Sequence, residues 1–235
     1  MFLDAGGVLV FPNWQRASEA LAAHGVPVDP ARLAAAEPIA KKRFDTGERM
    51  TGSTDQQRSW PYFNLVLEQA GVIQTAATDA ALSELHAYHA VHNLWEAVPA
   101  DVPAALVRFR ALGLRLVVIS NANGRLHAMF DRVGLSPLLD RVFDSFEEGV
   151  EKPDARLFQI ACQRTGTDPR EAIHVGDIYH VDVVGARNAG IRPVLLDPAG
   201  LHEDADCVRV RSLGALGDLV EEFKTTGAGP LRTCA

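Results

Sequence analysis

Two patterns of hydrophobic and polar positions divide this chain. An apolar run at residues 1–3 is followed, between residues 13 and 95, by segments that are typical of helices, and none of them is a strand candidate. From residue 99 onward, short continuous apolar runs alternate with helical segments, which is the pattern of βαβ units in a parallel sheet buried on both faces. The sequence therefore predicts an α/β fold with an all-helical insertion after its first strand.

The expected elements follow from this pattern and from helix start and stop signals. Within the insertion we predict helices at 14–24, 30–44, 53–71 and 78–93. The third helix should be capped by Ser53 and should bend or restart near Pro61, after a polar loop at residues 45–52. After the insertion we predict strands at 114–119, 142–144, 172–175 and 193–196, an edge strand at 207–210, and helices at 100–112, 125–133, 154–165, 181–189 and 213–224.

These elements define two domains. Residues 1–12 and 96–225 would form a doubly wound, Rossmann-like α/β core, and residues 13–95 would form a helical cap. Residues 226–235 are small and polar, so we expect a disordered tail.

Composition and charge exclude several classes of protein. Of the 235 residues, 47% are hydrophobic and 23% are charged, as in ordinary soluble globular proteins. The net charge of −7 argues against nucleic acid as a partner. We expect no membrane span, because no apolar run is long enough, and no signal peptide. The three cysteines show no pairing pattern, which favours a reducing, cytoplasmic location. The sequence allows a monomer or a homodimer.

Polar residues follow the predicted strands at the edge where a doubly wound sheet binds its ligands. They are Asp4, Ser120, Asn121, Lys152 (ahead of the helix at 154–165), Asp177 and Asp182. Taken alone, each aspartate is as consistent with a turn as with a functional group. Together the carboxylates would repel one another, and a lysine and a hard cation such as Mg²⁺ would relieve that repulsion. The serine hydroxyl and asparagine amide are suited to an anionic oxygen, so the set supplies what an in-line displacement needs.

Four stretches, in this order, resemble the motifs of the haloacid dehalogenase (HAD) superfamily, in the subgroup with a helical cap after the first strand. They are residues 4–9 (DAGGVL), Ser120-Asn121, Lys152-Pro153 and residues 176–182 (GDIYHVD). One such motif would be weak, whereas four at these spacings are specific. The resemblance implies a hydrolase, most simply a phosphatase that acts on a small phosphorylated metabolite with Mg²⁺ as its cofactor.

The resemblance also implies a role for each site residue. Asp4 would be the nucleophile that forms an aspartyl-phosphate, and Ser120 and Lys152 would hold the transferring group. Asp4, Asp177 and the backbone carbonyl of Gly6 would bind Mg²⁺. Asp182 would orient Lys152 or a metal-bound water.

One position departs from the family pattern. Most of its phosphatases carry a second aspartate two residues after the nucleophile, where this chain has Gly6. That aspartate protonates the leaving group and then activates water, and such acid–base catalysis contributes about 10²- to 10⁴-fold to the rate. We therefore expect a site that binds Mg²⁺ and phosphate yet turns over ordinary esters slowly.

Three alternatives stay open. A 2-haloacid dehalogenase needs no metal and tolerates the missing aspartate, although Asp177 departs from the pattern of those enzymes. A phosphonatase-like hydrolase of C–P bonds would use a cap lysine, here Lys41 or Lys42. Gly6 alone favours a protein that binds a phosphorylated ligand without turning it over.

Two further features carry an interpretation. Arg43, Asp45 and Arg49 flank a cap loop, which either reads the substrate, as such loops do in the family, or is a plain exposed loop. His174 lies inside a predicted strand, and we interpret it as a core residue.

Overall fold

The computed structural model describes residues 1–52, 54–227 and 231, without the side chains of residues 49, 51, 52, 55, 56 and 59. The chain divides into two compact units. One unit joins Met1–Phe11 to Val98–Ala235, and the other is Pro12–Ala97. Among the described residues, no helix has the length and apolar character needed to cross a membrane.

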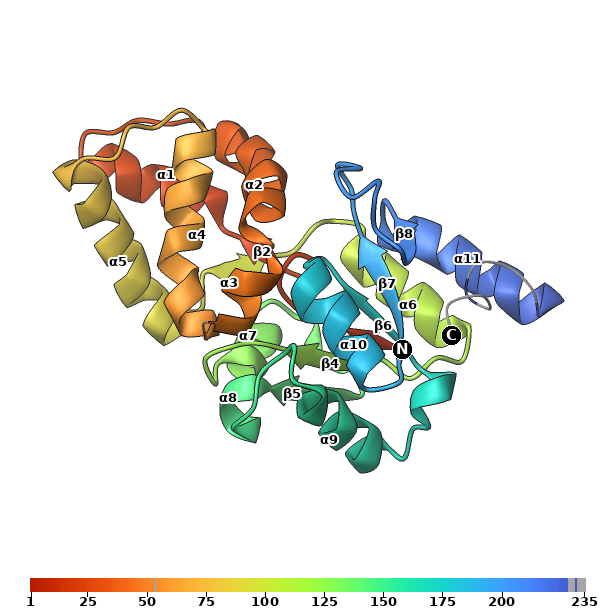
Figure 1. Cartoon of the computed structure of the whole chain (residues 1–235). Coiled ribbons are helices and arrows are strands. Elements are labelled where there is room, and N and C mark those ends of the chain that lie inside the picture. Colours follow the sequence, from red (N-terminus) through yellow and green to blue (C-terminus); the bar gives the residue numbers. More distant parts are fainter. Residues whose placement is uncertain (53, 228–230, 232–235) are drawn as a thin grey trace. The chain divides into compact units, whose positions relative to one another are not determined.

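A parallel sheet forms the centre of the first unit (Figure 1). Its strands are β1 (Phe2–Leu3), β4 (Val117–Ser120), β5 (Arg141–Asp144), β6 (Ile173–Gly176), β7 (Arg192–Leu196) and β8 (Val208–Val210). They lie in the order β5-β4-β1-β6-β7-β8. The predicted doubly wound α/β fold is therefore confirmed, with the short first strand at the centre between β4 and β6.

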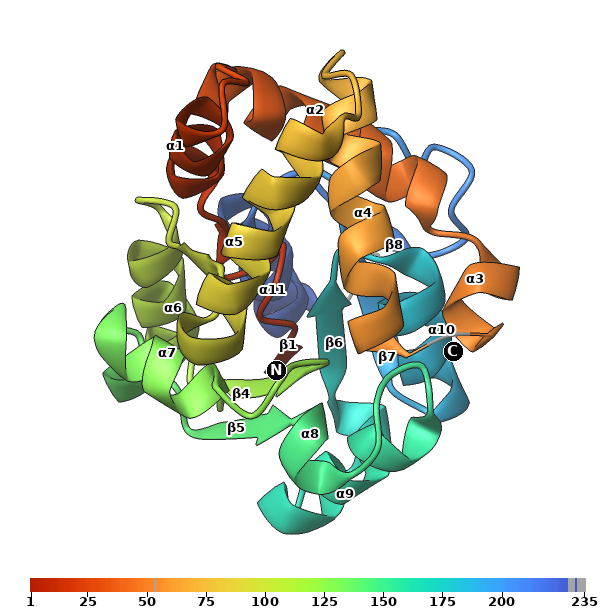
Figure 2. The same ribbon diagram turned by 90° about the vertical axis from the view of Figure 1, so that its left-hand side faces the viewer.

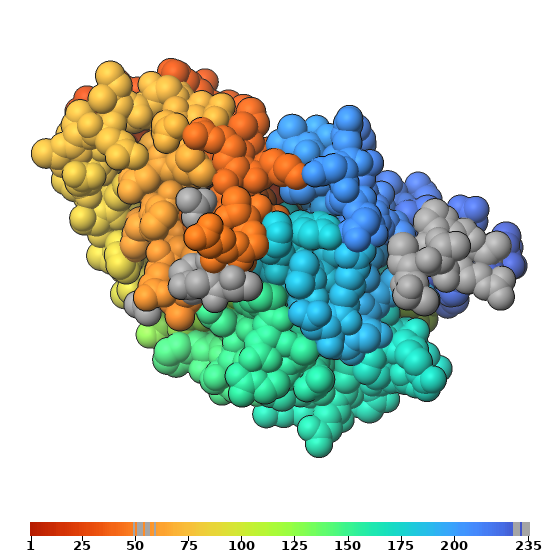
Figure 3. All heavy atoms as spheres, viewed as in Figure 1, coloured from red at the N-terminus to blue at the C-terminus, as the bar shows by residue number. Residues whose placement is uncertain are grey.

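Helices cover both faces of this sheet. They are α6 (Val102–Ala111), α7 (Leu126–Arg132), α8 (Ser145–Glu148), α9 (Ala155–Thr165), α10 (Val184–Asn188) and α11 (Leu213–Thr226). Helices α6 and α11 lie together on one face, and α9 and α10 lie together on the other (Figures 1 and 2). In the space-filling view, atoms of α9 and α10 form a continuous surface (Figure 3). Beneath them is an apolar cluster that includes Phe2, Val117 and Phe158.

The segment after β6 differs from its prediction. A regular helix was expected from residue 181, but residues Tyr179–Val183 form one π-helical turn, and α10 begins at Val184. The amide of Val184 donates to the carbonyl of Tyr179, five residues back. Hydrophobic spacing cannot reveal such a turn, because it inserts one extra residue without changing which side chains are apolar.

The second unit is built from five helices in its described residues: α1 (Trp14–Ala23), α2 (Pro30–Phe44), α3 (Gly47–Gly52), α4 (Asp55–Gln69) and α5 (Ala76–His92). Helix α2 packs against α4, and α1 packs against α5. Near its ends, β2 (Phe11–Pro12) pairs with β3 (Trp95–Ala97). The expectation of no strand between residues 13 and 95 was thus wrong at Trp95, because three residues are too few to show a strand pattern.

Two other predictions for this unit need correction. Residues 45–52 were expected to be a loop, but α3 occupies most of them despite a glycine at each end. Helix α4 does not restart at Pro61, which lies inside it. The predicted cap, Ser53, lies outside the described residues; Thr54 caps α4 instead, in a reciprocal capping box with Gln57.

Candidate active site

The sheet brings the predicted site residues to one edge. Leu3 is in register with Val118 of β4 and with Val175 of β6, so these three strands end side by side. Asp4 follows β1 directly, and its amide donates to the carbonyl of Val175 at 2.8 Å. Ser120 ends β4, and Asp177 follows β6. The adjacent carboxyl ends therefore gather these side chains, as the parallel topology predicts.

A tight turn after Asp4 leaves room for a second carboxylate. The carbonyl of Ala5 accepts the amides of Leu9 at 2.9 Å and Val10 at 3.0 Å, which curls the chain back on itself. Within this turn Gly7 has a φ of 74°, and a Cβ there would lie 1.8 Å from Oδ2 of Asp177. Only glycine fits both the backbone and the space. Gly7 is thus a site residue that was not predicted from the sequence.

Gly176 has a similar role for Asp182. A Cβ on Gly176 would lie 2.0 Å from Cγ of Asp182. The π turn carries Asp182 back toward the end of β6, where the amide of Ile178 donates to its Oδ2 at 3.1 Å. Two glycines therefore allow Asp177 and Asp182 to approach the strand ends.

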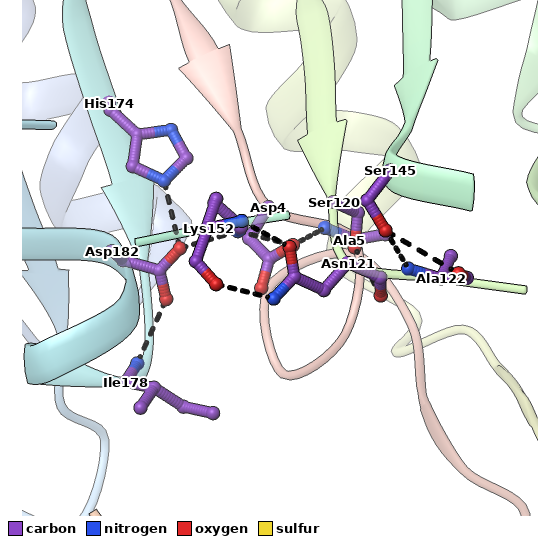
Figure 4. A network of polar contacts seen from close by, with 10 residues as sticks. All are labelled: Asp4, Ala5, Ser120, Asn121, Ala122, Ser145, Lys152, His174, Ile178 and Asp182. Atoms are coloured by element: carbon purple, nitrogen blue, oxygen red, sulfur yellow. Dashed lines mark hydrogen bonds and ion pairs between the residues drawn. The ribbon is translucent and has the colours of Figure 1, made fainter. Parts of the chain in front are cut away.

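Lys152 is fully buried between two of the carboxylates (Figure 4). Its Nζ lies 2.6 Å from Oδ1 of Asp182 and 3.0 Å from Oδ1 of Asp4. The amide of Ala5 also donates to Oδ1 of Asp4, at 2.8 Å. The Ser120 hydroxyl donates to the Asn121 carbonyl at 3.4 Å, and its proximity lowers the pKa of the Asp4 carboxyl. The Lys152 ammonium and the Ala5 amide thus orient the predicted nucleophile.

The side chain of Asn121 holds the backbone of Lys152. Its Nδ2 donates to the Lys152 carbonyl at 2.9 Å, and its Oδ1 accepts the Lys152 amide at 2.7 Å (Figure 4). From the sequence, this amide was predicted to hold an anionic oxygen. In the structure its hydrogen bonds serve the adjacent segment, 31 residues further along the chain.

One contact was not anticipated from the sequence. Nε2 of His174, in β6, lies 2.9 Å from Oδ1 of Asp182, the atom that also accepts from Lys152. Figure 4 shows His174, Asp182, Lys152 and Asp4 following one another in a chain of contacts. His174 and Asp182 are eight residues apart in the sequence. No known motif links two residues at this spacing, so the hydrophobic pattern predicts only that His174 lies in a strand.

Burial and charge set the ionisation of this chain of residues. Burial raises the pKa of Asp4 more than Lys152 lowers it. Burial alone would also raise the pKa of Asp182, but Lys152 and the hydrogen bond from His174 outweigh it, so that pKa lies below its ordinary value. Burial would lower the pKa of Lys152, yet Asp182 and Asp4 raise it overall. Lys152 and Asp182 therefore stay charged. The negative charge of Asp4 is the least stabilised of the three, because its neighbours do not offset the cost of its burial.

The carboxylates suit a hard cation. Asp4, Asp177 and Asp182 are buried and offer oxygen atoms within 4.8 Å of one another, a grouping found only here among the described residues. Asp182 already accepts from Lys152, His174 and the backbone. Asp4 and Asp177 are therefore the carboxylates placed to hold an ion such as Mg²⁺, which prefers oxygen ligands and would favour the ionised form of Asp4.

The predicted cap residues belong to the helical unit. Arg43 lies on α2, with its guanidinium 3.3 Å from Oε1 of Glu68. Asp45 is the C-terminal capping residue of α2. The side chain of Arg49 lies outside the described part of the structure. Nζ of Lys41 lies 2.8 Å from Oε1 of Glu37, and an ammonium paired with a carboxylate is a poor amine nucleophile.

The fold and the site together define a class of protein. A parallel α/β sheet whose edge holds a lysine between two buried carboxylates, beside a third, agrees with a hydrolase. The chain belongs to the haloacid dehalogenase-like hydrolase family, whose sequence model matches residues 1–190.

Similar proteins agree with this family. Haloacid dehalogenase-like hydrolase domain-containing protein 3 of Bos taurus is 31% identical over 187 residues, which cover 75% of this chain and 74% of that protein. Glyceraldehyde 3-phosphate phosphatase of Methanothermobacter thermautotrophicus is 32% identical, over 52% of this chain and 56% of that protein. Among solved structures, the HAD-hydrolase YfnB from Bacillus subtilis, bound to magnesium, shares the fold with a TM-score of 0.66. It is 15% identical, and the match covers 93% of this chain and 96% of that one.

Proposed function

We propose that this hydrolase is a Mg²⁺-dependent phosphatase that acts on a small phosphorylated metabolite through an aspartyl-phosphate on Asp4. The observation that carries the proposal is the contact of Lys152 with both Asp4 and Asp182, beside the carboxylate of Asp177. A buried ammonium next to a carboxylate nucleophile stabilises the charge that gathers on a transferring phosphoryl group. A relative named as a phosphatase supports the same substrate class.

The residues divide the reaction between them. An oxygen of Asp4 attacks phosphorus and forms a new O–P bond, while the bond from phosphorus to the ester oxygen breaks and that oxygen takes a proton from solvent water. Lys152 and the Ser120 hydroxyl hold the phosphoryl oxygens. Water then attacks the aspartyl-phosphate, releases phosphate and restores the Asp4 carboxylate. Asp182 keeps Lys152 in place during both steps.

Mg²⁺ would be held by Asp4, Asp177 and the backbone carbonyl of Gly6. When bound, it neutralises the charge on the phosphoryl oxygens. Gly7 serves this site indirectly, because its missing side chain gives Asp177 its room.

The helical unit, Pro12–Ala97, would serve as the cap that reads the substrate. Its candidate reading residues are Arg43, Asp45 and Arg49. The ion pair between Lys41 and Glu37 weighs against Lys41 as the reactive amine of a phosphonatase. The three grouped carboxylates weigh against a metal-independent dehalogenase.

A panel of phosphate esters, phosphonates and 2-haloacids, assayed with Mg²⁺ and with EDTA, tests the proposal. We expect hydrolysis of an aryl phosphate such as p-nitrophenyl phosphate that depends on Mg²⁺ and is lost in Asp4→Asn. Halide release that survives EDTA would identify a dehalogenase instead. No reaction with any member of the panel would favour a protein that only binds a phosphorylated ligand.

The variant Gly6→Asp tests the cost of the missing acid–base group. We expect its turnover of the aryl phosphate to rise by about 10²-fold or more, since general acid–base catalysis contributes about 10²- to 10⁴-fold. An unchanged turnover with normal Mg²⁺ dependence would mean that another group already protonates the leaving oxygen.

A further inference from the structure

His174 lies where the apolar core would accept a hydrocarbon side chain. In the register of β1 and β6 it is opposite Phe2, a member of the apolar cluster under α9. Its ring meets that of Phe158 edge-on, with centroids 4.8 Å apart and an interplanar angle of 80°. The side chain is fully buried. A buried polar ring costs stability unless hydrogen bonds compensate it, so packing alone does not account for a histidine at this position.

The contacts of the ring define its chemical form. Nε2 lies 2.9 Å from Oδ1 of Asp182, and an ionised carboxylate can only accept, so Nε2 must carry a proton. Nδ1 is buried and has no hydrogen-bond partner among the described residues, as expected of a bare ring nitrogen. Burial lowers the pKa of His174 more than Asp182 raises it. The ring is therefore a neutral donor.

A neutral donor differs from a second cation in its effect on Asp182. It fixes the direction of the carboxylate without competing for its negative charge, which stays available to Lys152. Oδ1 accepts from both His174 and Lys152, and Oδ2 accepts from the amide of Ile178. With all three donors in place, the Asp182 carboxylate has one orientation, and Lys152 is directed at Asp4.

We propose that His174 is a positioning residue, whose Nε2–H holds Asp182 in the orientation that presents Lys152 to Asp4. The role in catalysis rests on the proposed phosphatase function, because Lys152 acts there on the phosphoryl group. The role of His174 in orienting Asp182 and ordering Lys152 does not rest on that function, because it concerns only the hydrogen bond and the position of Lys152.

Two variants separate the hydrogen bond from the packing. His174→Leu fills the same space with an apolar side chain of similar reach and removes the donor. His174→Gln places an N–H donor at a similar distance. For p-nitrophenyl phosphate with Mg²⁺, we expect kcat to fall by about 10- to 100-fold in His174→Leu, the loss typical of a hydrogen bond to a charged group. The KM should change little, and His174→Gln should recover most of kcat.

A third variant controls for lost stability. Ile191→Ala removes a buried side chain from the same apolar cluster but no hydrogen-bonding group. We expect it to lower the melting temperature and to leave kcat near that of the wild type. If His174→Leu likewise lowers only the melting temperature, or if His174→Gln is as slow as His174→Leu, the positioning role is wrong.

A spectroscopic measurement tests the geometry without any turnover. In ¹⁵N NMR spectra at neutral pH, the His174 ring should show a protonated Nε2 and a bare Nδ1. The ammonium protons of Lys152 should exchange slowly in the wild type and in His174→Gln, and about tenfold faster in His174→Leu, because local order protects against exchange. If the wild type hydrolyses no phosphate ester, the proposed function is wrong, but this measurement still tests whether His174 orders Lys152. Equal exchange of Lys152 in all three proteins would overturn the inference.

Discussion

Asp182 and Asp197 are both buried, and each lies beside a histidine and a basic side chain after neighbouring strands of the sheet. Around Asp182 the contacts are short, 2.9 Å to Nε2 of His174 and 2.6 Å to Nζ of Lys152. Around Asp197 they are longer, 3.4 Å to Nδ1 of His202 and 3.5 Å to the guanidinium of Arg209. The two regions contain the same kinds of group but differ in how closely those groups meet.

They also differ in where the donors come from. Asp197 accepts the amides of Leu201 at 2.9 Å and His202 at 3.0 Å, so it closes a local turn after β7. Asp182 accepts from Lys152, 30 residues earlier in the chain, and that lysine reaches a further carboxylate, Asp4. Local donors make a turn, whereas donors from distant segments that lead to another charged group make a site. Residue types alone do not distinguish the two cases.

The largest expected effect comes from Asp182→Asn. This change leaves the buried Lys152 with one carboxylate fewer, and breaking a buried ion pair costs about 3–5 kcal/mol of stability. We expect a large drop in the urea concentration at the unfolding midpoint, together with a severe loss of aryl phosphate hydrolysis. A variant as active as the wild type, and destabilised no more than Asp197→Asn, would show that Asp182 is no more than a turn residue, like Asp197.

An intermediate effect is expected from Asn121→Leu. It removes both hydrogen bonds to the Lys152 backbone, and kcat should fall by about tenfold if this loosens the lysine. Ser145→Ala is the matched control, because the Ser145 hydroxyl bonds the backbone of Ala122, one residue further along the same loop. A rise in KM for Asn121→Leu with kcat unchanged would instead favour direct binding of the phosphoryl group by the amide.

The smallest effect on activity is expected from Asp197→Asn. Its kcat should match that of the wild type, while the free energy of unfolding at neutral pH falls by about 1–3 kcal/mol through weaker hydrogen bonds to the turn. Burial raises the pKa of Asp197, but the amides of His202 and Leu201 outweigh it and lower the pKa below 3.8.

Because the pKa of Asp197 is lowered, the difference in stability between the wild type and Asp197→Asn should depend on pH. The stability that the ionised carboxylate contributes is complete above pH 3.8 and is lost as the pH falls through the lower native value. The wild type and Asp197→Asn should therefore converge in stability on acidification, as urea unfolding at several pH values would show. A constant difference down to the lowest pH would rule out this account of Asp197.

Much of the fold could be predicted from the sequence, because buried parallel strands appear as continuous apolar runs. The ends of those runs also identified Asp4, Ser120 and Asp177 as neighbours, since parallel strands end at one edge. Contacts that depend on exact distances could not be predicted from the sequence. The sequence gives no sign that Asn121 pairs with the backbone of Lys152 or that His174 reaches Asp182.

The glycines show the same limit. Gly7 and Gly176 look like ordinary turn and strand-end residues, and only the structure shows carboxylates in the space that a side chain would fill. Short elements such as α3 and the π turn were missed because a single turn carries too few residues for a periodic pattern. The sequence therefore identifies which residues gather, while the structure shows which of them hold the others in place.

Trapping the covalent intermediate tests the central claim most directly. The wild-type protein is mixed with Mg²⁺ and a phosphate ester labelled in its phosphoryl group, quenched in acid, digested and analysed by mass spectrometry. We predict a hydroxylamine-sensitive phosphoryl group on Asp4, which is absent from Asp4→Asn. Normal ester hydrolysis without a labelled Asp4, or with the label on another residue, would contradict the account.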